Sequence, residues 1–209
     1  MTNDFYFIAE SENGMGRCLV PKVSWSDDFI DVVHKEKISV LRLTDSMGWR
    51  DSDIYFLEKL QSVGLRGVEI YARGVKDITP LQFIPSLEYL GLQCEFNKAP
   101  DFSKFSHLKI CKLFWRPKAK SVFSCSILEQ LNVVNYPSED LSVLATLAGL
   151  KCLQLTSRRL VSLAGIDSLQ GLITLDLAYC PKLGSLTGIE RCQKLQMVEL
   201  KNCKKVGDV

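Results

Sequence analysis

The stretch Leu150–Leu155 reads Leu-Lys-Cys-Leu-Gln-Leu, with leucine at its first, fourth and sixth positions. Its last three residues alternate apolar, polar, apolar, which is typical of a strand that is buried on one face only. A strand this short cannot bury its own leucines. The stretch therefore predicts a strand that is stable only beside neighbours of the same kind.

Eight copies of this six-residue pattern recur along the chain. They begin at Ile38, Leu65, Leu87, Leu108, Leu128, Leu150, Leu172 and Leu195. Successive starts lie 27, 22, 21, 20, 22, 22 and 23 residues apart. A nearly fixed period indicates a solenoid in which each repeat packs on the next, so that the strands form one parallel sheet over a shared core.

The segments between the strands carry a second period. Leucines at 141, 144, 147 and 150 are spaced by three, and the later repeats follow the same spacing. This spacing favours 3₁₀ turns over α-helix. The longer first interval differs, and for Asp51–Val63 we expect a true α-helix that ends at Gly64.

The strand pattern resembles that of the leucine-rich-repeat family, in its short internalin-like form, over about residues 38–206. The resemblance implies an α/β solenoid: a horseshoe with a parallel concave sheet and a mainly 3₁₀ convex side. The family has Asn or Cys at the ninth position of the repeat, and Cys180 and Cys203 match it. We expect irregular loops in the six copies that do not: Ser46, Arg73, Glu95, Arg116, Tyr136 and Arg158.

Residues 1–37 precede the repeats and are expected to form an N-terminal cap. Glu12-Asn13-Gly14 is a hairpin signal between the apolar segments 5–8 and 18–20, and a short helix is predicted from Ser26 through Val33. Such a cap shields the edge of the first strand. Residues 38–209 are then expected to form one continuous domain of eight strands, whose last repeat either caps itself or is covered by a partner.

Composition narrows the possible functions. The 209 residues are 46% hydrophobic with a formal net charge of +2, which gives no general attraction to nucleic acid or to an anionic membrane. No apolar run reaches the length of a membrane span, and no secretory signal is evident, so we expect a cytoplasmic protein. The eight cysteines include no Cys-x-x-Cys pair and are expected to be free thiols.

No catalytic, metal or cofactor site is predicted. The chain contains none of the common phosphate-loop, dinucleotide, zinc-protease or serine-hydrolase motifs. Its two histidines, His34 and His107, fall in distant parts of the solenoid. Four cysteines (Cys111, Cys180, Cys192 and Cys203) occupy repeat positions that small buried residues fill. We therefore expect no enzyme activity and no small-molecule substrate.

The side chains between the apolar strand positions are expected to form the exposed concave surface. Aromatic residues and arginine, which dominate the energetics of protein interfaces, gather there in repeats 2–4. The candidate protein-binding residues are Arg42, Glu69, Tyr71, Tyr89, Gln93, Lys112, Phe114, Trp115 and Arg116. Two alternatives stay open: the rings, Trp115 above all, pack into irregular loops, and the basic run from Arg116 to Lys120 is simply solvated or meets an acidic patch or RNA.

A protein partner is the function that these features favour. Small repeat proteins of this kind resemble the cytosolic immunity proteins of bacterial polymorphic toxins, including Rhs-type effectors. That resemblance implies binding to a toxin domain and occlusion of its active site. The alternative is a regulatory or adaptor subunit, similar to the phosphatase-binding members of the short-repeat subfamily.

Overall fold

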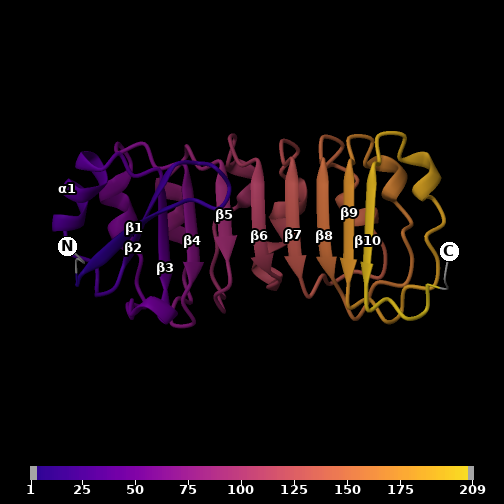
Figure 1. Ribbon diagram of the computed structural model, residues 1–209, viewed down its shortest axis with the longest axis horizontal. Helices are drawn as coiled ribbons and strands as arrows, with labels where there is room; N and C mark the ends of the chain where they lie inside the picture. The colour runs from indigo at the N-terminus through magenta and orange to yellow at the C-terminus, as the bar shows by residue number, and fades with distance from the viewer. Residues whose placement is uncertain (1–3, 207–209) are drawn as a thin grey trace. The chain divides into compact units, whose positions relative to one another are not determined.

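The computed structural model describes residues 4–206, which form short strands that alternate, after an initial hairpin, with segments behind the sheet (Figure 1). The strands are β1 (Tyr6–Glu10), β2 (Arg17–Pro21), β3 (Val40–Thr44), β4 (Gly67–Tyr71), β5 (Tyr89–Leu92), β6 (Ile110–Phe114), β7 (Gln130–Val134), β8 (Cys152–Thr156), β9 (Thr174–Ala178) and β10 (Met197–Lys201). The helices are α1 (Asp28–Lys35) and the 3₁₀ helices η1 (Asp45–Met47), η2 (Tyr55–Leu60), η3 (Thr79–Phe83), η4 (Phe102–Lys104), η5 (Pro117–Ser124), η6 (Ser142–Leu144), η7 (Ile166–Ser168) and η8 (Ile189–Arg191).

The chain forms two compact units. Unit 1 comprises the residues up to Asp101 together with Phe105–Leu108, and unit 2 comprises Phe102–Lys104 and the residues from Lys109 onward. The expectation of a single continuous domain over residues 38–209 stays a prediction.

Unit 1 begins with the predicted hairpin and helix. β1 and β2 pair antiparallel, and β2 then pairs in parallel with β3, followed by β4 and β5. α1 starts one residue after Asp27 and carries Asp28 and Asp31 in its first turn, where acids interact favourably with the helix dipole. The hairpin and helix of the cap are confirmed, and β2 supplies the strand that covers the edge of β3.

Unit 2 is the more regular of the two. β6 to β10 pair in parallel in chain order, with matching repeat positions side by side. Leu131, Leu153 and Leu175 stand in one row and are at most 1% exposed. Each such leucine stabilises the fold by about 2 kcal/mol relative to an exposed side chain. The strand predictions are confirmed position by position in β6 to β9.

The rear segments follow the spacing of three. Leu141, Leu144 and Leu147 are all fully buried, and η6 runs through the middle of them. A 3₁₀ helix has three residues per turn, so side chains three apart point the same way and all reach the core. The leucine-rich-repeat fold and its 3₁₀ backing are thus confirmed.

The α-helix predicted for Asp51–Val63 is wrong. The segment holds only the six-residue η2, and Gly64 follows it with a φ of +77°. Its apolar residues Ile54, Leu57 and Leu60 are spaced by three and are fully buried. The spacing of three therefore selects 3₁₀ geometry here as in the other repeats. The additional residues of this longer interval form turns.

β10 differs from the other strands of unit 2. Its core positions Val198 and Leu200 are 41% and 36% exposed, whereas their neighbours on β9, Leu175 and Leu177, are fully buried. Among the described residues no further strand pairs with the outer edge of β10. The last repeat therefore leaves part of its own apolar face uncovered.

Candidate functional site

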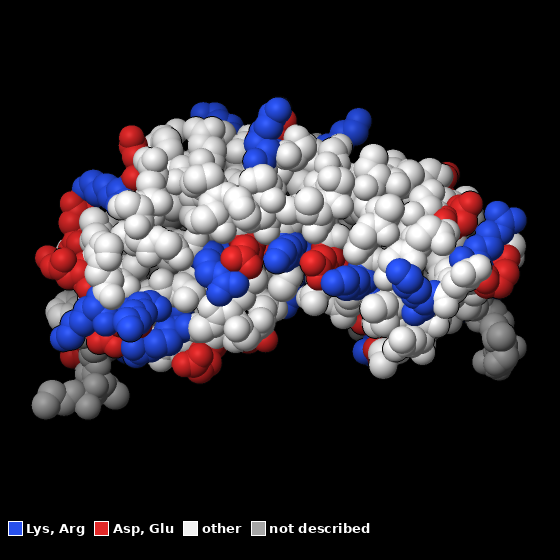
Figure 2. Space-filling view, turned by 90° about the horizontal axis from the view of Figure 1, so that it is seen from above, with Lys and Arg blue, Asp and Glu red and all other residues white. Residues whose placement is uncertain are grey.

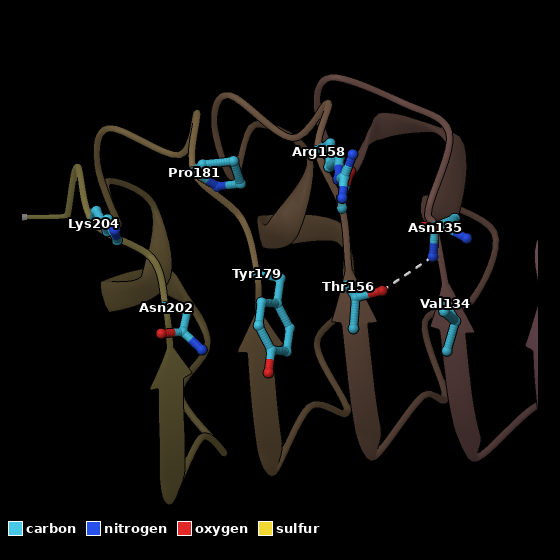
Figure 3. Close-up of a pocket in the computed structure, with 9 residues that line it drawn as sticks. Val134, Asn135, Thr156, Arg158, Tyr179, Pro181, Asn202 and Lys204 are labelled. Carbon is cyan, nitrogen blue, oxygen red and sulfur yellow. Dashed lines mark hydrogen bonds between the residues drawn. The ribbon is translucent and has the colours of Figure 1, made fainter.

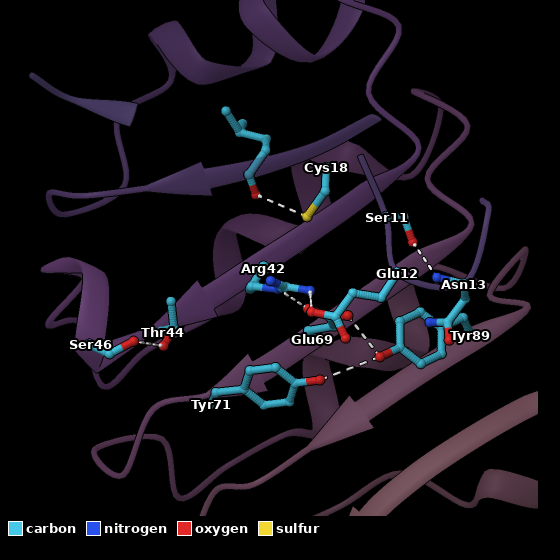
Figure 4. Close-up of polar contacts among 11 residues, drawn as sticks. Ser11, Glu12, Asn13, Cys18, Arg42, Thr44, Ser46, Glu69, Tyr71 and Tyr89 are labelled. Carbon is cyan, nitrogen blue, oxygen red and sulfur yellow. Dashed lines mark hydrogen bonds and ion pairs between the residues drawn. The ribbon is translucent and has the colours of Figure 1, made fainter. Parts of the chain in front are cut away.

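The loop of the N-terminal hairpin, residues 11–16, lies over the sheet of unit 1 (Figures 1 and 4). Ser11 and Met15 in this loop are 7% and 9% exposed. Beneath it, outward strand positions that were expected to be solvent-exposed are buried, among them Val40, Glu69 and Tyr89. The expected exposure of Glu69 and Tyr89 is therefore wrong, because strand alternation sets the face of a side chain but not what covers that face.

Glu69 is the centre of a polar cluster under this loop (Figure 4). Its carboxylate is fully buried, accepts a hydrogen bond from Arg42 Nε and accepts another from the Tyr89 hydroxyl at 2.7 Å. Arg42 also forms an ion pair with Glu12 of the hairpin loop at 3.0 Å. The hydroxyls of Tyr71 and Tyr89 are 3.3 Å apart. A buried carboxylate is tolerated because it has both a cationic and a hydroxyl partner.

Two glycines provide the space for these tyrosines. A Cβ at Gly91 would lie 2.8 Å from the Tyr71 hydroxyl, and one at Gly67 would lie 3.0 Å from the Tyr89 ring. Gly67 and Gly91 are paired across the sheet with Tyr89 and Glu69 respectively. Both glycines therefore serve close packing on the outward face of the sheet.

The cluster has the electrostatics of a structural site. Burial raises the pKa of Tyr71 to about 12, and burial likewise raises the pKa of the nearby Cys18 thiol to about 12. Burial also raises the pKa of Tyr89 above its ordinary value. Tyr71, Tyr89 and Cys18 are therefore uncharged in this cluster, and its attachment to the hairpin rests on the ion pair of Arg42 with Glu12.

The remaining predicted residues are accessible to different degrees. In unit 1, Arg42 and Tyr71 are half-buried and Gln93 is exposed. In unit 2, the half-buried side chains are Lys112, Phe114, Trp115 and Arg116. The structure thus groups Arg42, Glu69, Tyr71 and Tyr89 in one cluster and places the last four together at the end of β6.

The outward face of unit 2 is a row of half-buried polar side chains. The Asn132 amide donates to the Gln154 carbonyl oxygen at 3.0 Å, and the Gln154 amide donates to Asp176 at 3.3 Å. These three residues occupy equivalent positions on β7, β8 and β9. Because these three side chains hydrogen-bond to one another, they form a fixed surface. The type of side chain on this surface changes from one repeat to the next.

Trp115 packs beside this face. Its ring stacks on Phe123 of η5 at 5.0 Å, with the two planes 5° apart, and Arg116 Nη1 donates to the Trp115 carbonyl. In the structure Trp115 packs into the loop, which is one of the two alternatives that the sequence left open. Trp115 is only half-buried, so its binding role stays a prediction.

A pocket that the sequence did not suggest lies at the carboxyl ends of β7–β10 (Figure 3). Its volume is about 690 Å³, and its lining includes Asn135, Thr156, Arg158, Tyr179, Asn202 and Lys204. One signal was available: Arg158 stands at the ninth repeat position, where Cys180 and Cys203 of the next repeats are buried. A charged residue at a position that favours small buried residues indicates that its side chain has a role at the protein surface.

Acidic and basic side chains are interspersed on the face shown in Figure 2. Among residues 4–206 no three His, Cys, Asp or Glu side chains gather as a metal site would need, and all eight cysteines are free. His107 is an exposed loop residue, as expected. Within the same residues no helix has both the length and the apolar composition to cross a bilayer.

Comparison with known proteins identifies the fold. No protein-family model matches the sequence, and no curated protein matches it either. Among solved structures, internalin C2 of Listeria monocytogenes superposes with a TM-score of 0.64 at 16% identity, over 88% of this chain and 80% of that one. Internalin F of the same organism gives 0.52 at 22% identity, over 77% of this chain and 47%, about half, of that one. At these identities the likeness shows a shared leucine-rich-repeat fold.

Proposed function

We propose that this chain is a non-catalytic protein-binding module that uses the outward face of its parallel strands. The observation that carries the proposal is the face of unit 2. There a row of hydrogen-bonded polar side chains on β7–β9 stands beside the half-buried Phe114, Trp115 and Arg116. A surface ordered before binding loses little conformational entropy on association, and aromatic and arginine side chains supply most of the energy at protein interfaces.

Phe114 gives the sharpest test. Once a partner has been identified, Phe114→Ala is expected to weaken its binding by about thirtyfold, the equivalent of a hot-spot loss of about 2 kcal/mol. Tyr71 is a less clean target, because its hydroxyl contacts Tyr89 and Arg42 lies over its ring at 5.9 Å. Titration calorimetry with the purified partner measures the effect.

Val143→Ala is the matched control. Val143 is apolar and 44% exposed but lies on η6, behind the strands. If both variants bind as the unmodified chain does, the outward face is not the interface and the proposal fails.

For the class of partner we propose a toxin domain that the chain occludes in the cytoplasm. The resemblance to polymorphic-toxin immunity proteins supports this assignment, and a rigid surface of mixed charge suits a tight inhibitor. Co-expression is expected to restore the growth of cells that carry the cognate toxin, whereas the Phe114→Ala variant restores less. A partner enzyme that keeps its activity in the complex would instead favour an adaptor role.

A further inference from the structure

We propose that the pocket at the carboxyl ends of β7–β10 binds a carboxylate-bearing, acidic segment of a protein partner. The proposal accepts that the chain binds protein but concerns a different surface of unit 2 from the Phe114 face. Three observations carry it: the charge of the pocket, its hydrogen-bond donors and the residue at its centre.

The charged residues of the pocket are all basic. Arg158 and Lys204 line it together with no Asp or Glu, and neither has an ion-pair partner among residues 4–206. Lys151 of the same unit, by contrast, is paired with Glu129 at 2.7 Å. Two cations at one pocket attract an anion, and a guanidinium binds a carboxylate through two parallel hydrogen bonds.

The uncharged lining adds further donors. The exposed side-chain amides of Asn135 and Asn202 have no partner within the described part of the chain, and both residues line the pocket (Figure 3). The Asn135 backbone is held in place, because its N–H donates to the Thr156 hydroxyl at 3.0 Å. The pocket therefore presents donors on a preformed frame and suits a ligand rich in acceptors.

Tyr179 at the centre of the pocket is the most informative residue. Asn135, Tyr179 and Asn202 each follow a strand directly, and all three have positive φ, at 63°, 54° and 56°. Asparagine tolerates this conformation, whereas an aromatic residue adopts it at a cost. The Tyr179 side chain is 62% exposed, so packing in the core does not account for it. A strained, exposed ring at a position that Asn135 and Asn202 hold in two other repeats indicates that the ring serves binding.

An acidic peptide titration tests the site. The probe is a hexaglutamate peptide added to the full ¹⁵N-labelled chain, with hexaglutamine as the neutral comparison, and amide shifts are followed by NMR. We expect saturable shifts at Asn135 and Asn202 with a dissociation constant of about 1 mM, the weak range for a short flexible peptide. Hexaglutamine is expected to give none.

Two neighbouring arginines provide the matched variants. Arg158→Gln and Arg159→Gln remove the same charge one residue apart, but only Arg158 lines the pocket; Arg159 Nη1 donates to the Pro137 carbonyl. Arg158→Gln is expected to weaken peptide binding at least fivefold and Arg159→Gln less than twofold. Equal weakening would show attraction by net charge alone and would overturn the proposal.

Tyr179→Asn separates binding from folding. This change introduces the residue that the next repeat has at the same position, Asn202, whose φ is also positive, so the midpoint of denaturation should stay equal or rise while peptide affinity falls. An unchanged affinity would contradict the role of the ring. A phosphoserine hexapeptide that binds tenfold more tightly than hexaglutamate would overturn the carboxylate assignment in favour of a phosphate site.

The peptide experiment tests the pocket independently of the proposed function. Phe114→Ala should leave hexaglutamate binding unchanged, because Phe114 does not line the pocket. If Phe114→Ala leaves partner binding unchanged while the chain still binds hexaglutamate, only the proposed interface is refuted. If Phe114→Ala weakens partner binding but the chain does not bind hexaglutamate, only the pocket is refuted.

Discussion

Glu69 occupies an outward position of β4, where strand alternation places a side chain away from the repeat core. It is nevertheless fully buried, because the hairpin loop of residues 11–16 closes over it. Arg42 supplies the compensating charge, and Glu12 ties Arg42 to the loop. A residue that the sequence pattern marks as a surface acid thus holds the N-terminal cap to the sheet.

The ion pair predicts the effect of Arg42→Met. This change keeps the length of the side chain but leaves Glu69 buried without a cation. We expect a loss of about 3 kcal/mol in the free energy of unfolding, the lower end for a broken buried pair, because a fifth of the Arg42 side chain is exposed. Urea denaturation measures it. The double variant Arg42→Met/Glu69→Leu should recover part of the loss, and a single variant as stable as the parent would refute the structural role of the pair.

At the scale of elements, the tight turns at the back of unit 2 depend on particular glycines. Gly165 precedes η7 with a φ of +92°, and a Cβ there would lie 2.7 Å from backbone atoms of Ser142. Backbone atoms cannot swing aside as a flexible side chain can. The stacking of one rear segment on the next therefore requires a residue without a Cβ at this position.

Gly165→Ala is expected to destabilise the protein by about 2 kcal/mol or more, from backbone strain together with the clash. Gly184→Ala is the control, since a Cβ at Gly184 meets nothing within 4 Å. Gly64→Ala isolates strain from clash, because Gly64 also has positive φ but open space around it. Thermal and urea unfolding should rank the losses as Gly165, Gly64, Gly184. Equal losses at all three positions would contradict the explanation.

At the scale of the whole molecule, buried neutral groups make stability depend on alkaline pH. Burial raises the pKa of Cys18 from 9.0 to about 12 and that of Tyr71 from 10.0 to about 12. The unfolded chain loses these protons first, so it binds fewer protons than the folded chain between those values. The contribution to stability is complete below about pH 9 and is lost as the pH rises toward about 12.

We therefore expect the urea midpoint of the protein to fall steadily above pH 9. One thiol contributes about 1.4 kcal/mol of this loss at a pH one unit above its unfolded pKa. Circular dichroism across a series of pH values measures the midpoint, and Cys18→Ala should flatten the slope. A midpoint independent of pH between 9 and about 10.5 would contradict the burial of these groups.

The sequence by itself determined the repeat, its period and the core. Leu131, Leu153 and Leu175 follow from local alternation, and the spacing of three at Leu141, Leu144 and Leu147 selects 3₁₀ geometry. The same spacing of three at Ile54, Leu57 and Leu60 favours 3₁₀ geometry over the α-helix that was expected there. These features were predictable because each depends on residues within one repeat or on the repetition itself.

Only the tertiary structure decided which outward positions are available. Glu69 and Tyr89 were covered by a loop more than fifty residues earlier in the chain, and Arg158, Tyr179 and Lys204 were brought to one pocket from three successive repeats. Periodicity gives the direction of a side chain relative to its own strand. What lies over that side chain depends on contacts between residues distant in sequence, and a pattern read along a single repeat carries no information about them.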